Sequence, residues 1–428
     1  MTDPTDLPLA PDRAVCLGTL RPAGRLATLD DAQIVQALRR PIWRDASDRR
    51  AVVDTVRPGE KTCLVVSDHT RRTCTHRVLP LLMRELAAKG VAAGDCFILF
   101  ASGIHRLPQA AEIRSILGNE VAESFAGRIL FHDPDAAAEL VSVGVTSRGH
   151  RVRVNRRAIE ADRLILIGAA TYHYHAGFGG GRKSLVPGLA ARDTIAYNHS
   201  LTLDAQADRI RPGVEIGRLD GNPVAEEMLE GARLCEPDAI VNTVLSSAGE
   251  LVGVFAGDLD LAHRAACRLV EQVDRVDLGV LADFVIASAR HASNWIQSHK
   301  ALFNASRAVR EEGRIVLSAP CPDGIGNERF RYWVTRPAVE DIYRGLRQSP
   351  EVLGQTALST RLRGARTTLI TGLSAQDVRD LGIETAPDVA AGVSRALAHL
   401  ADQGIARPTY YLMPEADSVV PWPPVGSA

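Results

Sequence analysis

The sequence predicts an α/β fold: two α/β domains with mostly parallel sheets and an active site in the cleft between them. Short apolar runs rich in β-branched residues alternate with amphipathic segments, which is the pattern of parallel sheets covered by helices. The chain has 428 residues, more than one hydrophobic core usually supports. Hydrophobic residues make up 46% and charged residues 24%, as in an ordinary globular enzyme.

The first domain opens with an alternation of strands and helices. A buried strand over 62–68 precedes a helix over 76–90 that ends on glycine, and a strand over 96–102 precedes a helix over 108–118 with proline near its start. Further strands follow over 127–133 and 163–171.

The pattern changes from Asp220 to about Arg275. We expect this stretch to be irregular apart from two antiparallel strands, 238–246 and 250–258, joined by a turn at Ala248-Gly249. A second alternation then begins, with strands over 283–289, 313–320 and 365–373, a helix over 294–310 and two later helices, and it predicts a smaller second sheet. With the boundary near 276 to 280, the domains are 1–276 and 277–405, and the tail 406–428 is expected to return to the first domain.

Charge and targeting signals narrow the class of protein. The chain has 50 basic and 51 acidic side chains, so nothing indicates a nucleic-acid partner. No basic patch followed by an apolar run opens the sequence, and no stretch of about 18 apolar residues predicts a membrane span, so we expect a cytoplasmic protein. The seven scattered cysteines are expected to be mostly buried thiols in a reducing compartment.

Polar side chains gather where strands end, which is where ligands bind in open α/β sheets. Arg71, Arg106 and Lys183 follow three predicted strands, and Lys300 follows a strand of the second domain. Since guanidinium groups pair with planar carboxylates, these residues predict an anionic substrate or a phosphate-bearing cofactor. Gln297 and Lys300 are three apart on a predicted helix and therefore share a face.

The segment "HYHAGFGGGRKSLVPGLA", residues 173–190, resembles a phosphate loop but matches neither standard pattern. Arg182 separates Gly181 from Lys183, whereas a Walker loop places lysine directly after glycine. The third glycine of a dinucleotide fingerprint also falls on Arg182. Anion binding through backbone N–H groups and a flexible loop without function both stay open.

Four histidines cluster at predicted strand ends: His105, His173, His175 and His199. Imidazole serves either as a metal ligand or as a general acid and base near neutral pH. Their spacing does not match a zinc motif such as H-E-x-x-H. Together, at loop positions, they favour a functional site.

These pieces resemble the lactate racemase family that uses a nickel-pincer nucleotide cofactor. "DHTR" at 68–71 resembles the family's D-x-T-R-P, "GIHR" at 103–106 its G-x-H-R, and 173–188 its H-x-x-A-G-x-x-G-G-R-K-S-x-x-P-G. His199 stands sixteen residues beyond Lys183, as the family's nickel ligand stands beyond its anchoring lysine, and "QSHKA" at 297–301 is the fifth match.

The resemblance implies a role for each matched residue. Lys183 would hold the cofactor covalently through a thioamide, and His199 would be the protein's ligand to nickel, which suits square-planar coordination. The two acid/base residues would be His105 and His173. Substrate would bind Arg71, Gln297 and Lys300, and Asp68 and Thr70 would support the cofactor. The glycines would leave room for a flat cofactor.

The implied reaction is racemisation or epimerisation of a 2-hydroxy acid. Removing hydride from the α-carbon gives a stable 2-oxo acid, and the cofactor holds the hydride until it returns to either face. One base must take the hydroxyl proton from each enantiomer, so two histidines on opposite sides are expected. Arg71 would hold the carboxylate while the carbonyl turns. The partners implied are a small 2-hydroxy acid and, transiently, the proteins that synthesise the cofactor.

Three positions depart from the family's pattern: Arg72 replaces a proline, His175 an aromatic or apolar residue, and Ile296 a tyrosine. We therefore expect Arg72, His175 or both to adapt the site to a 2-hydroxy acid larger or more polar than lactate.

Two other functions stay open. One is hydride shuttling at a carbon that is not next to a carboxylate. The other is a non-catalytic binder or carrier of the cofactor or of an anionic metabolite, which would need no acid/base pair.

Overall fold

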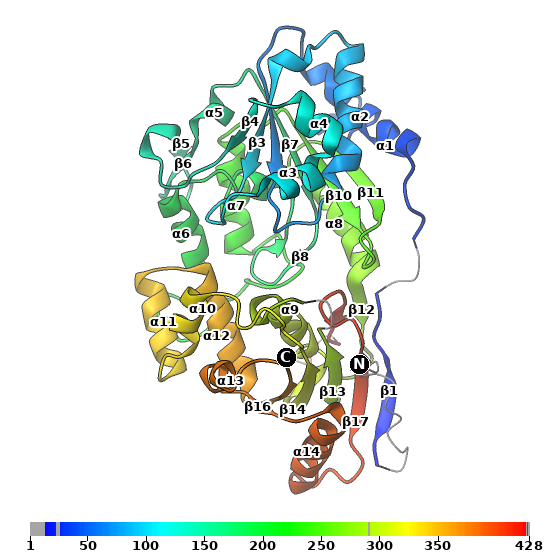
Figure 1. Cartoon of the computed structure of the whole chain (residues 1–428), viewed down its shortest axis with the longest axis vertical. Helices are drawn as coiled ribbons and strands as arrows, with labels where there is room; N and C mark the ends of the chain where they lie inside the picture. The colour runs from blue at the N-terminus through cyan, green and yellow to red at the C-terminus, as the bar shows by residue number, and fades with distance from the viewer. Residues whose placement is uncertain (1–12, 23–25, 290–291, 425, 427–428) are drawn as a thin grey trace. The chain divides into compact units, whose positions relative to one another are not determined.

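The computed structural model describes residues 13–22, 26–289, 292–424 and 426, and the chain divides into two compact units (Figure 1). The larger unit is Arg25–Gln272, and the smaller unit joins Met1–Gly24 to Val273–Ala428. Each unit contains a six-stranded sheet. Most strand pairs are parallel, which confirms the predicted α/β class.

The larger unit carries its sheet, two short hairpins and the helices that cover them. Its strands are β2 (Thr62–Ser67), β3 (Cys96–Ala101), β4 (Ile129–Phe131), β5 (Leu140–Val145), β6 (Arg151–Asn155), β7 (Arg163–Ala169), β8 (Tyr172–His173), β9 (Gly177–Phe178), β10 (Ala239–Leu245) and β11 (Leu251–Gly257). Its α-helices are α1 (Asp31–Arg39), α2 (Thr75–Ala88), α3 (Ala110–Leu117), α4 (Asn119–Ser124), α5 (Arg156–Ile159), α6 (Arg192–Ser200), α7 (Pro223–Arg233) and α8 (Leu261–Asp274), which ends just past the boundary between the units. Short 3-10 helices are η1 (Val52–Thr55), η2 (Ala93–Asp95), η3 (Ala137–Glu139) and η4 (Gly181–Ser184).

The larger sheet has the strand order β11-β10-β7-β2-β3-β4. The five strands from β10 to β4 run parallel, and only β11 is antiparallel. The predicted antiparallel pair is thus confirmed, with the backbone N–H of Ser246 donating to the carbonyl of Glu250 across the turn. From β2 the chain adds β3 and then β4 on one side, and it later adds β7 and β10 on the other side of β2. The strand order therefore reverses between β2 and β7.

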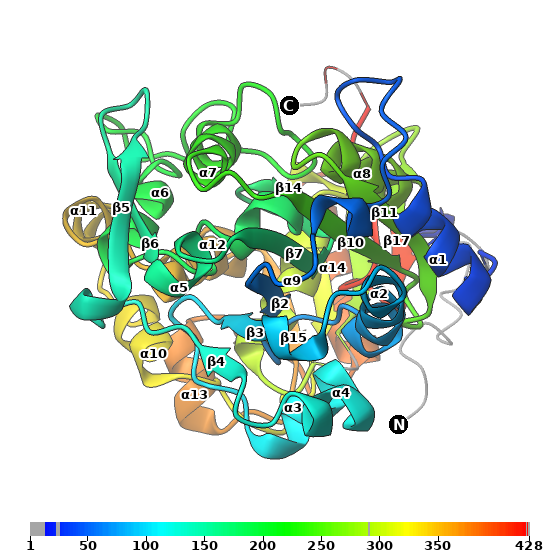
Figure 2. The ribbon, with the colours of Figure 1, turned by 90° about the horizontal axis from the view of Figure 1, so that it is seen from above.

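Side chains of the parallel strands alternate between two buried faces, as a period of two requires. Leu64 and Val66 of β2 pack in the cluster that contains α1 and α2, whereas Cys63 and Val65 pack in the cluster that contains α6 and α7. Figure 2 shows α2 on one side of these strands and α5 and α7 on the other. Burying each such aliphatic side chain stabilises the fold by about 1.5–3 kcal/mol.

The smaller unit is built around a second, fully parallel sheet. Its strands are β1 (Val15–Thr19), β12 (Arg275–Asp277), β13 (Ala282–Ser288), β14 (Val309–Ser318), β15 (Thr367–Ile370), β16 (Glu384–Thr385), β17 (Thr409–Met413) and β18 (Val420–Trp422). Its helices are α9 (Trp295–Ala305), α10 (Glu328–Val334), α11 (Val339–Gln348), α12 (Val352–Gly364), α13 (Ala375–Leu381) and α14 (Val389–Asp402). The six-stranded order is β1-β17-β13-β14-β15-β16, and β12 pairs with β18 apart from it.

The structure differs from the expected organisation at both ends of the chain. Residues 15–19 form β1, and the tail contributes β17 and β18, all within the smaller unit rather than the first domain. Both segments join the smaller sheet because the edge of β13 offers unpaired backbone groups. β17 forms hydrogen bonds along that edge, and β1 forms hydrogen bonds along β17.

Two other expectations were wrong. The stretch 220–275 contains the regular helices α7 and α8 beside its two strands, because apolar residues at helical spacing face the core there. The second sheet has as many strands as the first, since β1 and β17 join it. Among the described residues, no helix is both long and apolar enough to cross a membrane.

Candidate active site

The loops that follow β2, β3 and β7 carry all of the predicted site residues of the larger unit except His199, which lies on α6. Because these strands are parallel, their carboxyl ends meet at one edge of the sheet. The strand order reverses between β7 and β2, and in open α/β sheets ligands bind beside such a reversal, so the loops after these two strands are the expected place for a ligand. The loop after β3 is tied to the glycine segment, since the N–H of Gly103 donates to the carbonyl of Gly188 at 2.9 Å.

Asp68 and His105 form a hydrogen-bonded pair across two of these loops. Nδ1 of His105 lies 2.7 Å from Oδ2 of Asp68, and the hydroxyl of Thr70 donates to Oδ1 at 2.6 Å. Asp68 is 1% exposed, whereas the His105 side chain is 40% exposed. The buried carboxylate therefore orients an imidazole whose other edge reaches outward.

The pKa of Asp68 shows which form of the pair is stable. Burial raises the pKa of this carboxyl, but hydrogen bonds from His105 and Thr70 outweigh it, and the pKa is lowered from its ordinary value. Asp68 is thus ionised near neutral pH and accepts the proton on Nδ1 of His105. Nε2 then carries the lone pair that a general base needs.

The glycine segment is a packed structure rather than a flexible loop. β8 and β9 form a short hairpin, η4 follows, and the N–H of Gly181 donates to Oδ1 of Asn242 at 2.8 Å. A Cβ on Gly180 would lie 2.7 Å from the carbonyl oxygen of Ala169, and a Cβ on Gly177 would overlap the carbonyl of Arg218. The expectation that the glycines leave room for a flat cofactor was wrong, because protein atoms fill that space.

Lys183 is half-buried on η4, next to Arg182 in the sequence. Burial, together with the positive charges of Arg71 and Arg182, lowers the pKa of the Lys183 amine well below its ordinary value. A neutral amine is the nucleophilic form that a covalent attachment requires.

Arg182 itself is 3% exposed and pairs with a histidine instead of a carboxylate. Its Nη1 donates to Nδ1 of His263 at 3.0 Å, and Nε2 of His263 donates to the carbonyl of Gly179 at 2.7 Å. Sequence reasoning missed His263 and Asn242 because neither lies in a loop after a strand: one is on the buried face of α8 and the other inside β10. The sequence signal was Arg182, a second charged residue beside Lys183 in a run of otherwise small and apolar residues.

His173 is fixed by backbone donors. Its Nδ1 accepts hydrogen bonds from the N–H groups of His175 and Ala176 at 3.2 and 3.1 Å. Burial lowers the pKa of His173 well below its ordinary value, and the charges of Lys183, His175, Arg71 and His199 lower it further. His173, Lys183, Arg71 and His199 are therefore close enough for their charges to interact, which groups them as one candidate site.

His175 is buried, and its ring centre lies 6.3 Å from that of His173 and 4.2 Å from that of Tyr174. The ring of Tyr174 in turn stacks on His173 at 5.1 Å. His175 therefore belongs to the immediate surroundings of an acid/base residue.

His199 lies half-buried in the last turn of α6. Its Nδ1 donates to the carbonyl of Ile195 at 2.7 Å, which places the proton on Nδ1 and the lone pair on Nε2. Burial lowers the pKa of His199 to about 4, the bond to Ile195 opposes this, and the charge of Lys183 adds to it. A neutral imidazole with a fixed tautomer is the form that binds a transition metal. Among the described residues, no group of three or more histidine, cysteine or acidic side chains gathers as a metal site.

The arginines of these loops have different environments. Arg71 is exposed, and no hydrogen bond or ion pair of its side chain to another described residue is seen, so its guanidinium is available to an anion. Arg72 instead lies against Gly249 in the turn between β10 and β11. Arg106 forms a two-pronged ion pair with Glu112 at 2.6 and 2.8 Å.

Gln297 and Lys300 lie on the exposed face of α9 in the smaller unit. Asn294 caps this helix, its Oδ1 accepting from the N–H of Gln297 at 3.1 Å. Burial raises the pKa of Asp274 to about 7, and the charge of Lys300 opposes this, which places the ammonium near that carboxyl. That Gln297 and Lys300 complete the substrate pocket stays a prediction.

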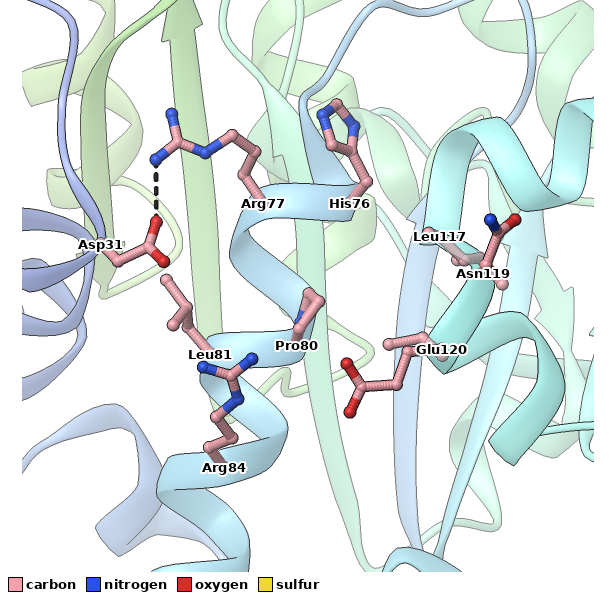
Figure 3. Close-up of a pocket in the computed structure, with 11 residues that line it drawn as sticks. Asp31, His76, Arg77, Pro80, Leu81, Arg84, Leu117, Asn119 and Glu120 are labelled. Atoms are coloured by element: carbon pink, nitrogen blue, oxygen red, sulfur yellow. Dashed lines mark hydrogen bonds and ion pairs between the residues drawn. The ribbon is translucent and has the colours of Figure 1, made fainter.

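A separate pocket of about 330 Å³ lies on the larger unit among α1, α2, α3 and α4 (Figure 3). Asp31 and Arg77 form an ion pair at 2.9 Å across its rim. None of the predicted site residues lines it.

Comparison with known proteins identifies the family. A model of the lactate racemase N-terminal domain matches residues 5–210. A lactate racemase from Thermoanaerobacterium thermosaccharolyticum is 32% identical over 279 residues, 64% of this chain and 63% of that protein, so the chain spans just under two thirds of its length. A lactate racemase from Lactiplantibacillus plantarum is 30% identical over 300 residues, 69% of this chain and 68% of that protein.

Solved structures agree with the sequence matches. The lactate racemase apoprotein from Thermoanaerobacterium thermosaccharolyticum has a TM-score of 0.83 at 27% identity, covering 97% of both chains. A crystal structure of a Thermotoga maritima protein shares the fold, with a TM-score of 0.66 at 18% identity, covering 93% of this chain and 99% of that one. The chain belongs to the lactate racemase family.

Proposed function

We propose that this protein is an isomerase that racemises or epimerises a 2-hydroxy acid with a covalently tethered nickel-pincer nucleotide. The family supplies the reaction class, and one observation in the structure carries the proposal for this chain. Burial and the charges of two arginines lower the pKa of Lys183 and favour its neutral amine, and Lys183 interacts electrostatically with both His173 and His199.

The chemistry of these side chains fits the cofactor. Lys183 offers an unprotonated amine for a thioamide, and His199 offers an imidazole nitrogen fixed by its bond to Ile195. When bound, the cofactor would supply a reversible acceptor for the hydride of the substrate's α-carbon.

The residues of the chain position the substrate and move its hydroxyl proton. Arg71 binds the carboxylate, because its exposed guanidinium, which pairs with no other described residue, can meet it in two-pronged geometry. His105 takes the hydroxyl proton on Nε2, and Asp68 stabilises the imidazolium that forms. His173, which interacts electrostatically with Lys183 and Arg71, is the acid/base residue for the other configuration. A carrier without turnover would not need a buried carboxylate to orient His105.

The substrate is proposed to be a 2-hydroxy acid larger or more polar than lactate. His175 supports this, since its ring lies close to His173 and Tyr174 where the family has an aromatic or apolar residue. Arg72 lies against Gly249, in the turn between β10 and β11, and is not part of this proposal. A panel of dicarboxylate, sugar and aryl 2-hydroxy acids, assayed with cofactor-loaded protein, tests the proposal, and lactate as the clear best substrate would contradict it.

The tether is tested by measuring the mass of the denatured protein after co-expression with the proteins that synthesise the cofactor. The sequence has only four lysines, at positions 61, 89, 183 and 300, so the site can be assigned without ambiguity. We expect an added mass in the wild type and in Lys89→Ala, whose lysine is exposed and pairs with Asp54, and none in Lys183→Ala. An adduct that persists in Lys183→Ala, or no adduct in the wild type, overturns the proposed anchor.

A further inference from the structure

We infer that His105 and His173 rest in opposite tautomers, so that the resting site presents a proton-accepting lone pair at Nε2 of His105 and a hydrogen-bond-donating N–H at Nε2 of His173. The inference deepens the proposed function and rests on it. It departs from the simplest two-base scheme, in which both histidines are equivalent acceptors.

The tautomer of His105 follows from what faces its Nδ1. Oδ2 of Asp68 lies 2.7 Å away and the hydroxyl oxygen of Thr70 lies 3.3 Å away. The Thr70 hydroxyl already gives its proton to Oδ1 of Asp68, so both groups at Nδ1 are acceptors. Nδ1 must therefore carry the proton, and Nε2 carries the lone pair.

The tautomer of His173 follows from the opposite environment. The two groups at its Nδ1 are the backbone N–H groups of His175 and Ala176, and a backbone N–H can only donate. Nδ1 must accept, so in the neutral ring the proton is on Nε2. Burial, aided by the nearby Arg71 guanidinium, lowers the pKa of His173 well below its ordinary value, which favours the neutral ring.

Because the two tautomers differ, the resting enzyme can take the hydroxyl proton at His105 but not at His173. A hydroxyl group that faces His105 meets a lone pair and can lose its proton to Nε2, which yields an imidazolium paired with the Asp68 carboxylate. A hydroxyl group that faces His173 meets an N–H and can only accept a hydrogen bond from it. Before His173 can take a proton on Nε2, its own proton must leave that nitrogen, and the two bonds from His175 and Ala176 must break if it moves to Nδ1.

The two configurations of the substrate are therefore bound by the resting enzyme in different ways. For a pair of enantiomers the equilibrium constant is one, so kcat/KM is equal in both directions. The asymmetry must then be found in kcat and KM separately, with the configuration that faces His173 showing the lower kcat and the lower KM.

Nitrogen NMR of the protein without cofactor tests the tautomers directly and needs no turnover. Protein labelled with ¹⁵N-histidine is measured by long-range ¹H–¹⁵N correlation near pH 7.5, and His105→Gln and His173→Gln identify the two rings by their missing signals. We expect the Nδ1–H form for His105 and the Nε2–H form for His173. His132 serves as an internal reference for the Nε2–H form, because its Nε2 faces the carbonyl oxygen of Ala190 at 3.0 Å.

A third variant separates the inference from a general effect of the site. In Asp68→Asn the side-chain amide can either donate a hydrogen bond to Nδ1 of His105 or accept one from it. His105 should therefore become a mixture of tautomers, while His173 stays unchanged. The same tautomer in both rings of the wild type, or a mixture at His173, overturns the inference. Either result leaves the lysine adduct of the proposed function untouched, so the two failures can be told apart.

Discussion

Asp68 is the residue that sets the orientation and the tautomer of His105. It is ionised, hidden from solvent and bonded to both Thr70 and His105. Asp68→Asn keeps the size of the side chain but removes the charge that fixes and stabilises the imidazolium of His105. We expect kcat/KM of the cofactor-loaded enzyme to fall by about 10²- to 10⁴-fold, with the mass adduct on Lys183 retained.

Glu112→Gln is the matched control for that variant. Glu112 is a second carboxylate near the loop after β3, but it pairs with the exposed Arg106 and touches neither histidine. Its replacement should change kcat/KM by less than about threefold, because an exposed ion pair contributes about 0–1 kcal/mol. Equal losses in both variants would show that charge near the loop, rather than the bond to His105, is what matters.

Arg71 is expected to act on binding of the substrate carboxylate. Losing a charge-assisted hydrogen bond costs about 1.5–3 kcal/mol, so Arg71→Ala should raise KM by about 10- to 150-fold. Steady-state kinetics across the 2-hydroxy acid panel measures this. An unchanged KM would favour the alternative reaction at a carbon that is not next to a carboxylate.

At the scale of elements, the glycine segment is where sequence reasoning was most incomplete. Its motif pointed to Lys183 and His173, since the residue types and spacing are visible in one dimension. What holds the segment in place is not visible there, because Asn242, His263 and Arg218 approach it from distant parts of the chain. The glycines therefore suggested space for a ligand, when they allow close packing against protein atoms.

Gly180→Ala tests this packing. The φ angle of Gly180 is +78°, and an added Cβ would lie 2.7 Å from the carbonyl of Ala169 and 2.8 Å from Oδ1 of Asn242. Gly149 has a similar φ of +81° but open space around it, so Gly149→Ala carries only the backbone strain. We expect Gly149→Ala to lower the free energy of unfolding by about 1 kcal/mol and Gly180→Ala by about 2–4 kcal/mol, measured with urea. Equal costs would mean that the segment yields to the extra methyl group.

The strands of the two sheets were predictable to a different extent. β2, β3 and β7 are continuous apolar runs ended by polar residues, and their positions follow from the sequence almost residue by residue. β1 is short, half-exposed and flanked by prolines, so its pattern is weak without β17 beside it. Pairing between distant segments is the information that local periodicity lacks.

At the scale of the whole molecule, each unit contains a buried neutral histidine that makes stability depend on pH. Burial, aided by the charge of Arg182, lowers the pKa of His263 to about 3, and burial, aided by Arg363, lowers the pKa of His299 to about 3. In the unfolded chain a histidine has a pKa of about 6.5. Below that pH the unfolded state takes up a proton that the folded state excludes, so stability falls as pH drops from about 6.5 towards 3.

For each such histidine, the free energy of unfolding falls by about 1.4 kcal/mol per pH unit, or by about 2 kcal/mol between pH 6.5 and 5. Urea unfolding at pH 7 and pH 5 measures it. His299→Asn should reduce the pH dependence by about that amount in the smaller unit, and His263→Asn should do so in the larger unit. A wild-type protein equally stable at both pH values would contradict the buried neutral state of both rings.

The larger unit is inserted between β1 and the rest of the smaller unit, and this order constrains how the chain folds as it is synthesised. All strands of the larger sheet have been made once residue 257 is complete, so that sheet can form early from segments close in sequence. β1 is made first, yet its partner β17 arrives only at residues 409–413. The first strand must therefore stay unpaired for nearly the whole of translation, which makes the smaller sheet the late and slow step of folding and its open edge the place where a nascent chain is exposed to aggregation.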